Sequence, residues 1–417
     1  MSIPERPLRV LIVSDFYPPL IGGATRSAQL LAHGLARRGH RVVVATTWQP
    51  GTVAAEDDGD VAVRRLRGLT MRLPALSGNP YRRIAPPFPD PELVWRLRRL
   101  LRRERPDVVH ASGWLAYSCA AALAGSDVPL VLAGRDYGHV CANGTLLQHD
   151  RSACTGPRLR KCLACAAGHY GPAKGTVAVL GVLGGRRLLR RRVAAVQSVS
   201  RHVREVLRAH LLRAPIEAVI PDFRAANGAR PDDRVLARLP RESFILFVGP
   251  LRQIKGVRVL LAAYERLADP PPLVVLGTRA PDMPAAFPPG VTVEYDVSHA
   301  TVMAAWERAL FGVAPSLIAE PLGNVVHEAM SRGRAVIGTR PGGHEEMIED
   351  GVDGLLVGRG DVEGLAAAMR RLAGDGDLRR RLERRAPERA ERFTEEVQLP
   401  RLEELLHRAA RGAEATA

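Results

Sequence analysis

The segment from Glu320 to Glu328, EPLGNVVHE, holds the residue types best suited to chemistry. It follows an apolar run that predicts a strand, and it continues into a predicted helix that ends near Met330. A helix N-terminus offers unpaired N–H groups and partial positive charge, which suit a diphosphate. Carboxylates beside it accept hydrogen bonds from sugar or ribose hydroxyls. Two solvated glutamates on a capped surface helix would explain the segment equally well if it stood alone.

Two other loops carry groups that suit phosphate. One follows a predicted strand at 244–249, where Lys255 could meet phosphate oxygens as a point charge and Arg252 could do so with two hydrogen bonds. The other contains Gly22 and Gly23, whose backbone could approach a phosphate or sugar closely. Taken singly, each loop has another explanation: the first could be an exposed basic turn and the second a tight turn.

Strand and helix patterns alternate around these loops. An apolar strand at Leu8–Ser14, the glycine loop, a helical period over Ala28–Leu35 and a strand at Arg41–Ala45 make a βαβ unit, which implies a parallel sheet. A second series of this kind begins at Phe244. We therefore predict an α/β fold of two Rossmann-like, doubly wound domains that face each other across a cleft, with ligands at the carboxyl ends of the strands.

The order and spacing of these motifs resemble those of the family 4 retaining glycosyltransferases, the group 1 type with the GT-B fold. The resemblance covers nearly the whole chain. Its most specific parts are the two glutamates eight residues apart and the segment GRAVIGTRPGGHEEMIEDGVDGLLV. It implies transfer of a hexosyl group, with retention, from a UDP- or GDP-linked sugar to a glycan, lipid-linked or small-molecule acceptor. Cell-surface polysaccharide or glycolipid synthesis is the expected setting.

The resemblance also implies roles for single residues. Glu328 would bind the ribose hydroxyls and Glu320 the hydroxyls of the donor sugar, while Lys255 and Gly23 would steady the departing diphosphate. Because the basic side chains and the helix terminus carry the leaving-group charge, no catalytic metal is expected. The resemblance also implies attack on the same face as the departing diphosphate, so no protein nucleophile is expected. The implied donor-binding residues are Gly22, Gly23, Lys255, Glu320, Leu322, Gly323, Asn324, Val325 and Glu328.

Three positions depart from the family's pattern. An arginine is usual after Gly249, where this chain has Pro250, so Arg252 becomes the candidate second cation.

The other two departures concern the acceptor side. Ser112 stands where many members have a second histidine after His110, and Arg135 stands where a histidine often precedes Asp136. Either Arg135 takes part in binding, or His139 or His110 serves instead. A purely structural role for His110, buried at a strand end, explains that residue equally well. The predicted catalytic residues are Glu320, Lys255, Arg252, His110 and Arg135.

We assign domain boundaries from these patterns. Residues 1–222 form an N-terminal acceptor-binding domain with a cysteine-rich insertion at about 135–185, expected to be irregular. Residues 223–241 form a polar linker that would act as a hinge, and residues 242–395 form the nucleotide-sugar-binding domain. Residues 396–417 form a helix expected to pack back toward the N-terminal domain.

Four cysteines, Cys141, Cys154, Cys162 and Cys165, cluster in the insertion and end in a C-x-x-C pair. Four thiolates can close a tetrahedral zinc site and order a segment that lacks a core of its own. Some bacterial members of the family resemble this stretch. An iron–sulfur cluster and plain reduced thiols remain alternatives to a structural zinc ion. Cys119 lies in an apolar helix and is expected in the core.

The chain of 417 residues has a formal net charge of +16, and arginines gather in two runs of the first domain. Such runs can bind anionic membranes, although an ordinary solvated face has the same composition. No secretory signal or span of about 20 apolar residues is evident. We expect a cytoplasmic protein, peripheral at the inner face of the cell membrane. The runs are Arg96, Arg98, Arg99, Arg102, Arg103 and Arg105, and Arg186, Arg187, Arg190, Arg191 and Arg192.

Two other function classes are weighed against this one. A sugar-nucleotide epimerase or hydrolase on the same fold would need acid and base groups from both domains. A non-enzymatic basic protein that binds membranes or nucleic acid would explain the charge but not the glutamates and Lys255. Aromatic residues make up only 5% of the chain, so nucleic acid is not an expected partner. A nicotinamide dehydrogenase is disfavoured because no G-x-G-x-x-G follows the first strand.

Overall fold

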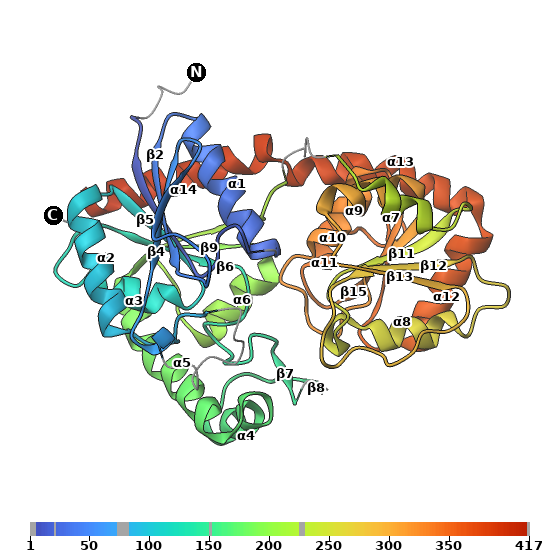
Figure 1. The fold of residues 1–417 in the computed structure, drawn as a ribbon, viewed down its shortest axis with the longest axis horizontal. Coiled ribbons are helices and arrows are strands. Elements are labelled where there is room, and N and C mark those ends of the chain that lie inside the picture. Colours follow the sequence, from blue (N-terminus) through green and yellow to red (C-terminus); the bar gives the residue numbers. More distant parts are fainter. Residues whose placement is uncertain (1–5, 21, 73–82, 150–151, 225–229, 415–417) are drawn as a thin grey trace. The chain divides into compact units, whose positions relative to one another are not determined.

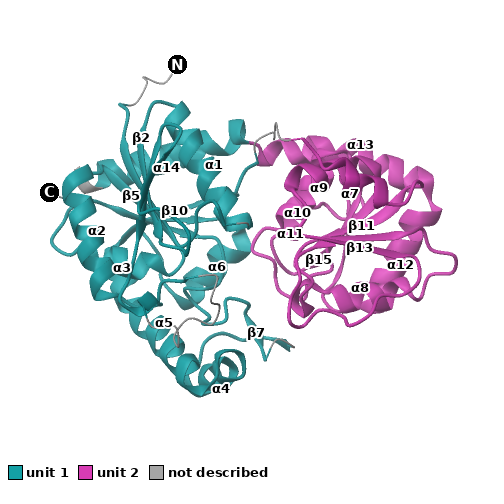
Figure 2. Ribbon diagram, in the orientation of Figure 1, with its two compact units in different colours: residues 1–224, 395–417 teal, residues 225–394 magenta. Residues whose placement is uncertain are grey.

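The computed structural model describes residues 6–20, 22–72, 83–149, 152–224 and 230–414. The chain divides into two compact units, residues 1–224 with 395–417 (unit 1) and residues 225–394 (unit 2), as Figure 2 shows. Each unit has helices packed on a largely parallel sheet (Figure 1). The predicted α/β fold of two Rossmann-like domains is therefore confirmed.

In its described residues, unit 1 has an eight-stranded sheet in the order β10-β9-β6-β5-β1-β2-β4-β3. Neighbouring strands run parallel except at the edge, where β3 pairs antiparallel with β4. The central strands are apolar along their length because both of their faces are buried. The strands are β1 (Arg9–Ser14), β2 (Arg41–Thr47), β3 (Ala55–Asp58), β4 (Val61–Leu66), β5 (Val108–Ser112), β6 (Leu130–Gly134), β9 (Val193–Ser198) and β10 (Ile216–Val219).

The helices of unit 1 form layers on this sheet. Helices α1 (Gly23–Arg37) and α14 (Glu395–Glu414) share one hydrophobic core with β1 and β2. Helices α2 (Pro91–Glu104), α3 (Leu115–Ala122) and α5 (Pro172–Arg192) lie side by side, with α2 packed on α3 and α3 on α5 (Figure 1). The remaining helices are η1 (Thr70–Arg72), α4 (Leu159–Tyr170) and α6 (Arg201–His210).

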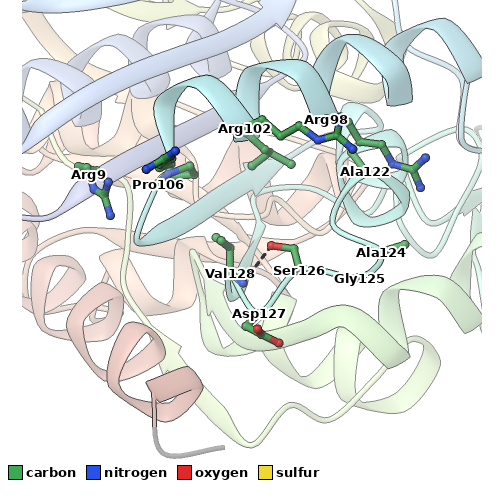
Figure 3. A pocket seen from close by; sticks show the side chains of 12 residues that line it. Arg9, Arg98, Arg102, Pro106, Ala122, Ala124, Gly125, Ser126, Asp127 and Val128 are labelled. Carbon is green, nitrogen blue, oxygen red and sulfur yellow. Dashed lines mark hydrogen bonds between the residues drawn. The ribbon is translucent and has the colours of Figure 1, made fainter. Parts of the chain in front are cut away.

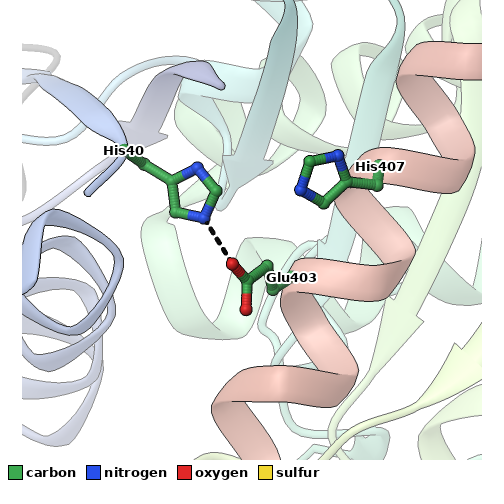
Figure 4. Close-up of side chains that lie close together, drawn as sticks. All are labelled: His40, Glu403 and His407. Atoms are coloured by element: carbon green, nitrogen blue, oxygen red, sulfur yellow. Dashed lines mark hydrogen bonds and ion pairs between the residues drawn. The ribbon is translucent and has the colours of Figure 1, made fainter. Parts of the chain in front are cut away.

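A polar clasp holds α14 against the rest of unit 1 (Figure 4). The Leu8 N–H donates to His40 Nδ1 at 3.0 Å, so His40 Nε2 carries the proton and donates to Glu403 at 2.8 Å. Arg38 Nε donates to the second oxygen of Glu403 at 2.6 Å. Burial acts to raise the pKa of the Glu403 carboxyl, but Arg38 and His40 outweigh it and the pKa is lowered. The last helix of the chain is thus fixed to the first domain.

The prediction that the insertion is irregular was wrong. Strand β7 (Leu147–Gln148) pairs antiparallel with β8 (Ser152–Ala153), and α4 and α5 form a helical hairpin behind them. Glycines that suggest breaks instead allow close helix packing, since a Cβ on Gly175 would lie 2.7 Å from the Ala166 backbone. The insertion also has a small core of its own, made of Ala142, Ala166, Ala178, Val179 and Val182.

Unit 2 has six described strands, all parallel, in the order β13-β12-β11-β14-β15-β16. The strands are β11 (Phe244–Val248), β12 (Leu273–Gly277), β13 (Val291–Tyr295), β14 (Ala309–Val313), β15 (Val336–Arg340) and β16 (Leu355–Gly358). The helices are α7 (Asp233–Arg238), η3 (Gln253–Lys255), α8 (Val257–Tyr264), α9 (His299–Arg308), α10 (Asn324–Ser331), α11 (His344–Met347), α12 (Val362–Gly374), α13 (Gly376–Ala390) and η4 (Glu391–Phe393).

The prediction of a linker over residues 223–241 was wrong for its second half. Helix α7 lies in this stretch and packs on α9. The Asp232 N–H donates to Thr301 Oγ1 at 2.9 Å, and Arg308 donates to the Leu236 carbonyl at 2.8 Å. The polar composition that suggested a linker belongs to a short capped surface helix. Residues 225–229 lie outside the described part of the chain.

Candidate active site

Lys255 and Glu320 form the centre of the candidate site in unit 2. Lys255 Nζ donates to Glu320 Oε1 at 2.7 Å, and Ser316 Oγ donates to the same oxygen. The loops after β11 and β14 meet here because position 256 is glycine. Gly256 has a φ of +75°, and a Cβ there would lie 1.8 Å from the Pro315 carbonyl oxygen. The two predicted residues, 65 positions apart, are thus in direct contact.

The Glu320 carboxylate is ionised although it is nearly buried. Burial acts to raise its pKa, but the charge of Lys255, the neighbouring His344 ring and the hydrogen bonds from Lys255 and Ser316 outweigh this effect, so the pKa is lowered. An ionised carboxylate accepts hydrogen bonds only, which suits sugar hydroxyls.

His344 joins this group, and our sequence interpretation did not assign it a role. It is buried, which lowers the pKa of its imidazole to about 4 and keeps the ring neutral. The Thr339 N–H donates to Nδ1 at 3.0 Å, so the proton is on Nε2. No described residue accepts from Nε2, which faces Gly323: a Cβ there would lie 2.4 Å from it. The site therefore has a neutral N–H donor in addition to Lys255.

The residues after Glu320 form the N-terminus of α10 as predicted. Gly323, with a φ of +95°, is the N-cap residue, and no side chain caps the helix. The first turn, which starts at Asn324 and Val325, holds no acidic residue. Leu322 is buried and anchors the turn. The first N–H groups of α10 can therefore bind an anion.

Glu328 lies one turn into α10 and is nearly buried. His299 Nε2, at the start of α9, lies 3.0 Å from Glu328 Oε1. The sequence pattern did not single out His299, because only the packing of α9 on α10 reveals the pair.

Arg252, the predicted second cation, forms a long ion pair with Asp282. Its Nε lies 3.8 Å from Asp282 Oδ1, and the other oxygen of Asp282 accepts from the Gln253 N–H at 2.9 Å. The structure therefore pairs Arg252 with Asp282 and leaves Lys255 as the cation that contacts Glu320.

The predicted residues of unit 1 lie at the carboxyl ends of β5 and β6. His110 is buried and its Nε2 lies 2.7 Å from Gln197 Oε1. Burial, with a contribution from Arg135, lowers the pKa of His110 to about 4, so the ring is neutral. Arg135 forms an ion pair with Asp222 at 3.1 Å. His139 Nε2 lies 2.9 Å from the Gly113 carbonyl oxygen. Each of these side chains is already engaged within unit 1.

The glycine pair of unit 1 opens a helix. Gly22 is the N-cap residue of α1 and Gly23 its first residue, without a side-chain cap or an acidic group in the first turn. A Cβ on Gly22 would approach only Thr25 Oγ1, at 3.8 Å, so the surroundings of the turn are open. This terminus has the same capacity for an anion as that of α10.

A cavity of about 740 Å³ lies elsewhere in unit 1 (Figure 3). Figure 3 shows Arg98 and Arg102 of α2 above the loop of residues 126–128. The cavity lies at the amino ends of β1, β5 and β6, whereas ligands of such folds bind at the carboxyl ends. A neighbouring cavity of about 410 Å³ shares the loop and adds Arg191 and Arg192. Both predicted arginine runs therefore reach one loop, away from the candidate active site residues of unit 1.

Comparisons with known proteins agree with this arrangement. The model of the glycosyl transferases group 1 matches residues 242–375, and that of the glycosyl transferase 4-like domain matches residues 22–222. Glycogen synthase of Mycobacterium tuberculosis is 27% identical over 424 residues, which cover 92% of this chain and 90% of that protein.

Solved structures share the fold. Sucrose-phosphate synthase from Thermosynechococcus elongatus has a TM-score of 0.71 at 19% identity and covers 98% of this chain and 100% of its own. HepE of Anabaena, solved in complex with UDP-glucose, has a TM-score of 0.67 at 16% identity and covers 95% and 99%. The chain belongs to the group 1, family 4 glycosyltransferases and has the GT-B fold.

Proposed function

We propose that this glycosyltransferase moves a hexosyl group, with retention, from a UDP- or GDP-linked sugar to a glycan or lipid-linked acceptor in the synthesis of cell-surface polysaccharide or glycolipid. The observation that carries the proposal is the contact between Lys255 and Glu320, beside the uncapped N-terminus of α10. HepE, a structural relative, was solved with UDP-glucose, which supports a nucleotide sugar as donor.

In this proposal, positive groups of the site meet the diphosphate, and its carboxylates meet the hydroxyl groups of the donor. The diphosphate gains negative charge as its bond to the sugar breaks, and Lys255 with the α10 N–H groups stabilises that charge. Glu320 holds Lys255 in place and accepts from the sugar hydroxyls. Glu328, paired with His299, receives the ribose hydroxyls. No step in this sequence requires a metal ion.

Retention follows in this proposal from attack on the face that the diphosphate leaves. Glu320 is a poor nucleophile because one of its oxygens already accepts from Lys255 and Ser316, and its pKa is lowered. The carboxylate therefore acts as a binding group. The acceptor hydroxyl attacks the anomeric carbon as the bond to the diphosphate breaks, and its proton passes to an oxygen of the departing diphosphate.

A panel of nucleotide sugars tests donor binding. The true donor should raise the melting temperature, because a ligand at 100 times its Kd stabilises the folded state by about 2.7 kcal/mol. Glu328→Ala should remove the shift. Glu363→Ala, which changes an exposed carboxylate paired with Arg266 in the same unit, should keep it. A protein that no nucleotide sugar stabilises would contradict the proposal.

We also propose that unit 1 binds anionic membranes through the exposed sides of α2 and α5. On α5, four exposed residues follow one helix face at spacings of three, seven and four, two of them apolar and two basic: Val177, Leu180, Arg187 and Arg191. On α2, Trp95 is 56% exposed among arginines. Apolar groups next to cations suit the boundary between headgroups and acyl chains. None of the helices in the described residues is long and apolar enough to span a membrane.

One predicted cation does not belong to that surface. Arg186 is half-buried, which lowers its pKa, and it donates to the Val140 carbonyl at 3.1 Å. It supports the insertion, so the membrane proposal rests on the exposed arginines.

A further inference from the structure

Four thiols from separate parts of the insertion line one small cavity. Cys141 precedes the β7–β8 hairpin, Cys154 follows it, and Cys162 and Cys165 lie in the first half of α4. The cavity has a volume of about 20 Å³, close to the space of one water molecule or one metal ion. The β7–β8 hairpin and the α4–α5 hairpin thus place four thiols around one small cavity.

Two N–H groups are directed at Cys165 Sγ, while Cys165 and Cys154 also lie within hydrogen-bond range of the Leu147 and Gly156 carbonyls. The His149 N–H donates to Cys165 Sγ at 3.3 Å, and Asn143 Nδ2 donates to the same sulfur at 3.5 Å. Such N–H donors stabilise a thiolate and orient it.

We propose that Cys141, Cys154, Cys162 and Cys165 together bind one structural zinc ion. Four soft sulfur donors and no open position fit tetrahedral zinc, with Zn–S distances of about 2.3 Å. Among the described residues, no three of these sulfurs lie within 4.8 Å of one another, so the cysteine side chains would rotate to close the site around the ion.

A second group has ligand atoms within 4.8 Å of one another, namely His40, Glu403 and His407. It carries no metal proposal, because both nitrogens of His40 are engaged. Nδ1 accepts from the Leu8 N–H, and Nε2 donates to Glu403. The thiols are the better ligands.

The ion would order the insertion. This segment follows β6, at the edge of the sheet where the acceptor is expected to bind. The insertion leaves the carboxyl end of β6 directly after Arg135, and Tyr170 of α4 donates back to the Ala142 carbonyl at 2.9 Å. Zinc would join the β7–β8 hairpin to α4 at the same place. Its loss should loosen this segment and leave donor binding in unit 2 unchanged.

The test is metal analysis of the full-length protein purified from zinc-replete cells. We expect about one zinc per chain, lost in the double variant Cys162→Ser/Cys165→Ser and kept in the control Cys119→Ala, which removes the cysteine buried in α3. Exchange of the wild-type metal for Co²⁺ should give the intense visible bands of a tetrahedral thiolate site, a readout that holds even if the double variant fails to fold. Wild-type protein without metal, zinc retained by the double variant, or iron with sulfide would each overturn the proposal.

Discussion

Lys255 is the residue whose chemistry the proposed mechanism uses most. Its ammonium stabilises the charge that develops on the departing diphosphate. Removing it should therefore destabilise the transition state more than the bound donor. Lys255→Ala should lower kcat about 100- to 1,000-fold with a smaller change in KM. Steady-state kinetics with the identified donor measure both constants.

The matched control is Arg266→Ala, which removes a cation from the same unit that pairs with the exposed Glu363. Its kinetics should equal those of the wild type. A Lys255→Ala enzyme with unchanged kcat and a raised KM would show that the lysine only binds the donor.

The loop positions of Lys255 and Glu320 and the start of α10 could be predicted from the sequence. A strand, a glycine turn and a helix in that order define where these groups lie. His344 and His299 could not be predicted in this way. His344 reaches Gly323 only because two loops pack together, and His299 meets Glu328 only because α9 packs on α10.

The sequence also did not reveal the hydrogen-bond and ion-pair partners of His110 and Arg135. Gln197 and Asp222 each lie 87 positions further along the chain, on segments whose pairing the local pattern does not reveal.

At the scale of elements, the clasp of α14 makes a pH-dependent contribution to stability. The folded pKa of Glu403 lies below its unfolded value of about 4.3. The clasp therefore adds stability above that value, and the contribution is lost as the pH falls through the folded pKa. Glu403→Gln should speed amide hydrogen exchange across α14 about tenfold at pH 7, as a loss of about 1.4 kcal/mol implies.

Exchange mass spectrometry of peptides from residues 395–414 measures this effect. Glu404→Gln, at the exposed next position, should leave exchange unchanged. The difference between Glu403→Gln and the wild type should shrink between pH 7 and a pH below the folded pKa of Glu403, where both side chains are uncharged. An equal difference at both pH values would show that the clasp is not electrostatic.

The apolar parallel strands could be predicted from the sequence because buried strands are continuous apolar runs. Strand β3, with the sequence AEDD, could not, since it is an exposed edge whose pairing with β4 supplies its order. The helices α4 and α5 were missed because glycines at their contact, such as Gly175, resemble helix breaks in the sequence.

At the scale of the whole molecule, the net charge of +16 should appear as salt-dependent membrane binding. Co-sedimentation should show more protein on anionic vesicles than on neutral ones, and less at 1 M salt, where the Debye length falls from about 10 Å to about 3 Å. Arg187→Glu/Arg191→Glu should weaken binding while donor stabilisation is kept. Arg190 is spared in this variant because it donates to the Leu211 carbonyl.

The matched control reverses the same number of charges in unit 2. Arg381→Glu/Arg384→Glu changes exposed arginines of α13 and should bind vesicles more tightly than the α5 variant does. Equal loss in both variants would mean that net charge, rather than the α2 and α5 surface, governs attachment.

The most direct test of the central claim is the anomeric configuration of the product, read by NMR on samples taken early in the reaction with the donor that the panel identifies. The proposed site, with Lys255 on the leaving group and Glu320 as a binding group, predicts a product with the configuration of the donor. Lys255→Ala should form the same product more slowly. An inverted product, or release of the free sugar without transfer to any acceptor, would contradict the account.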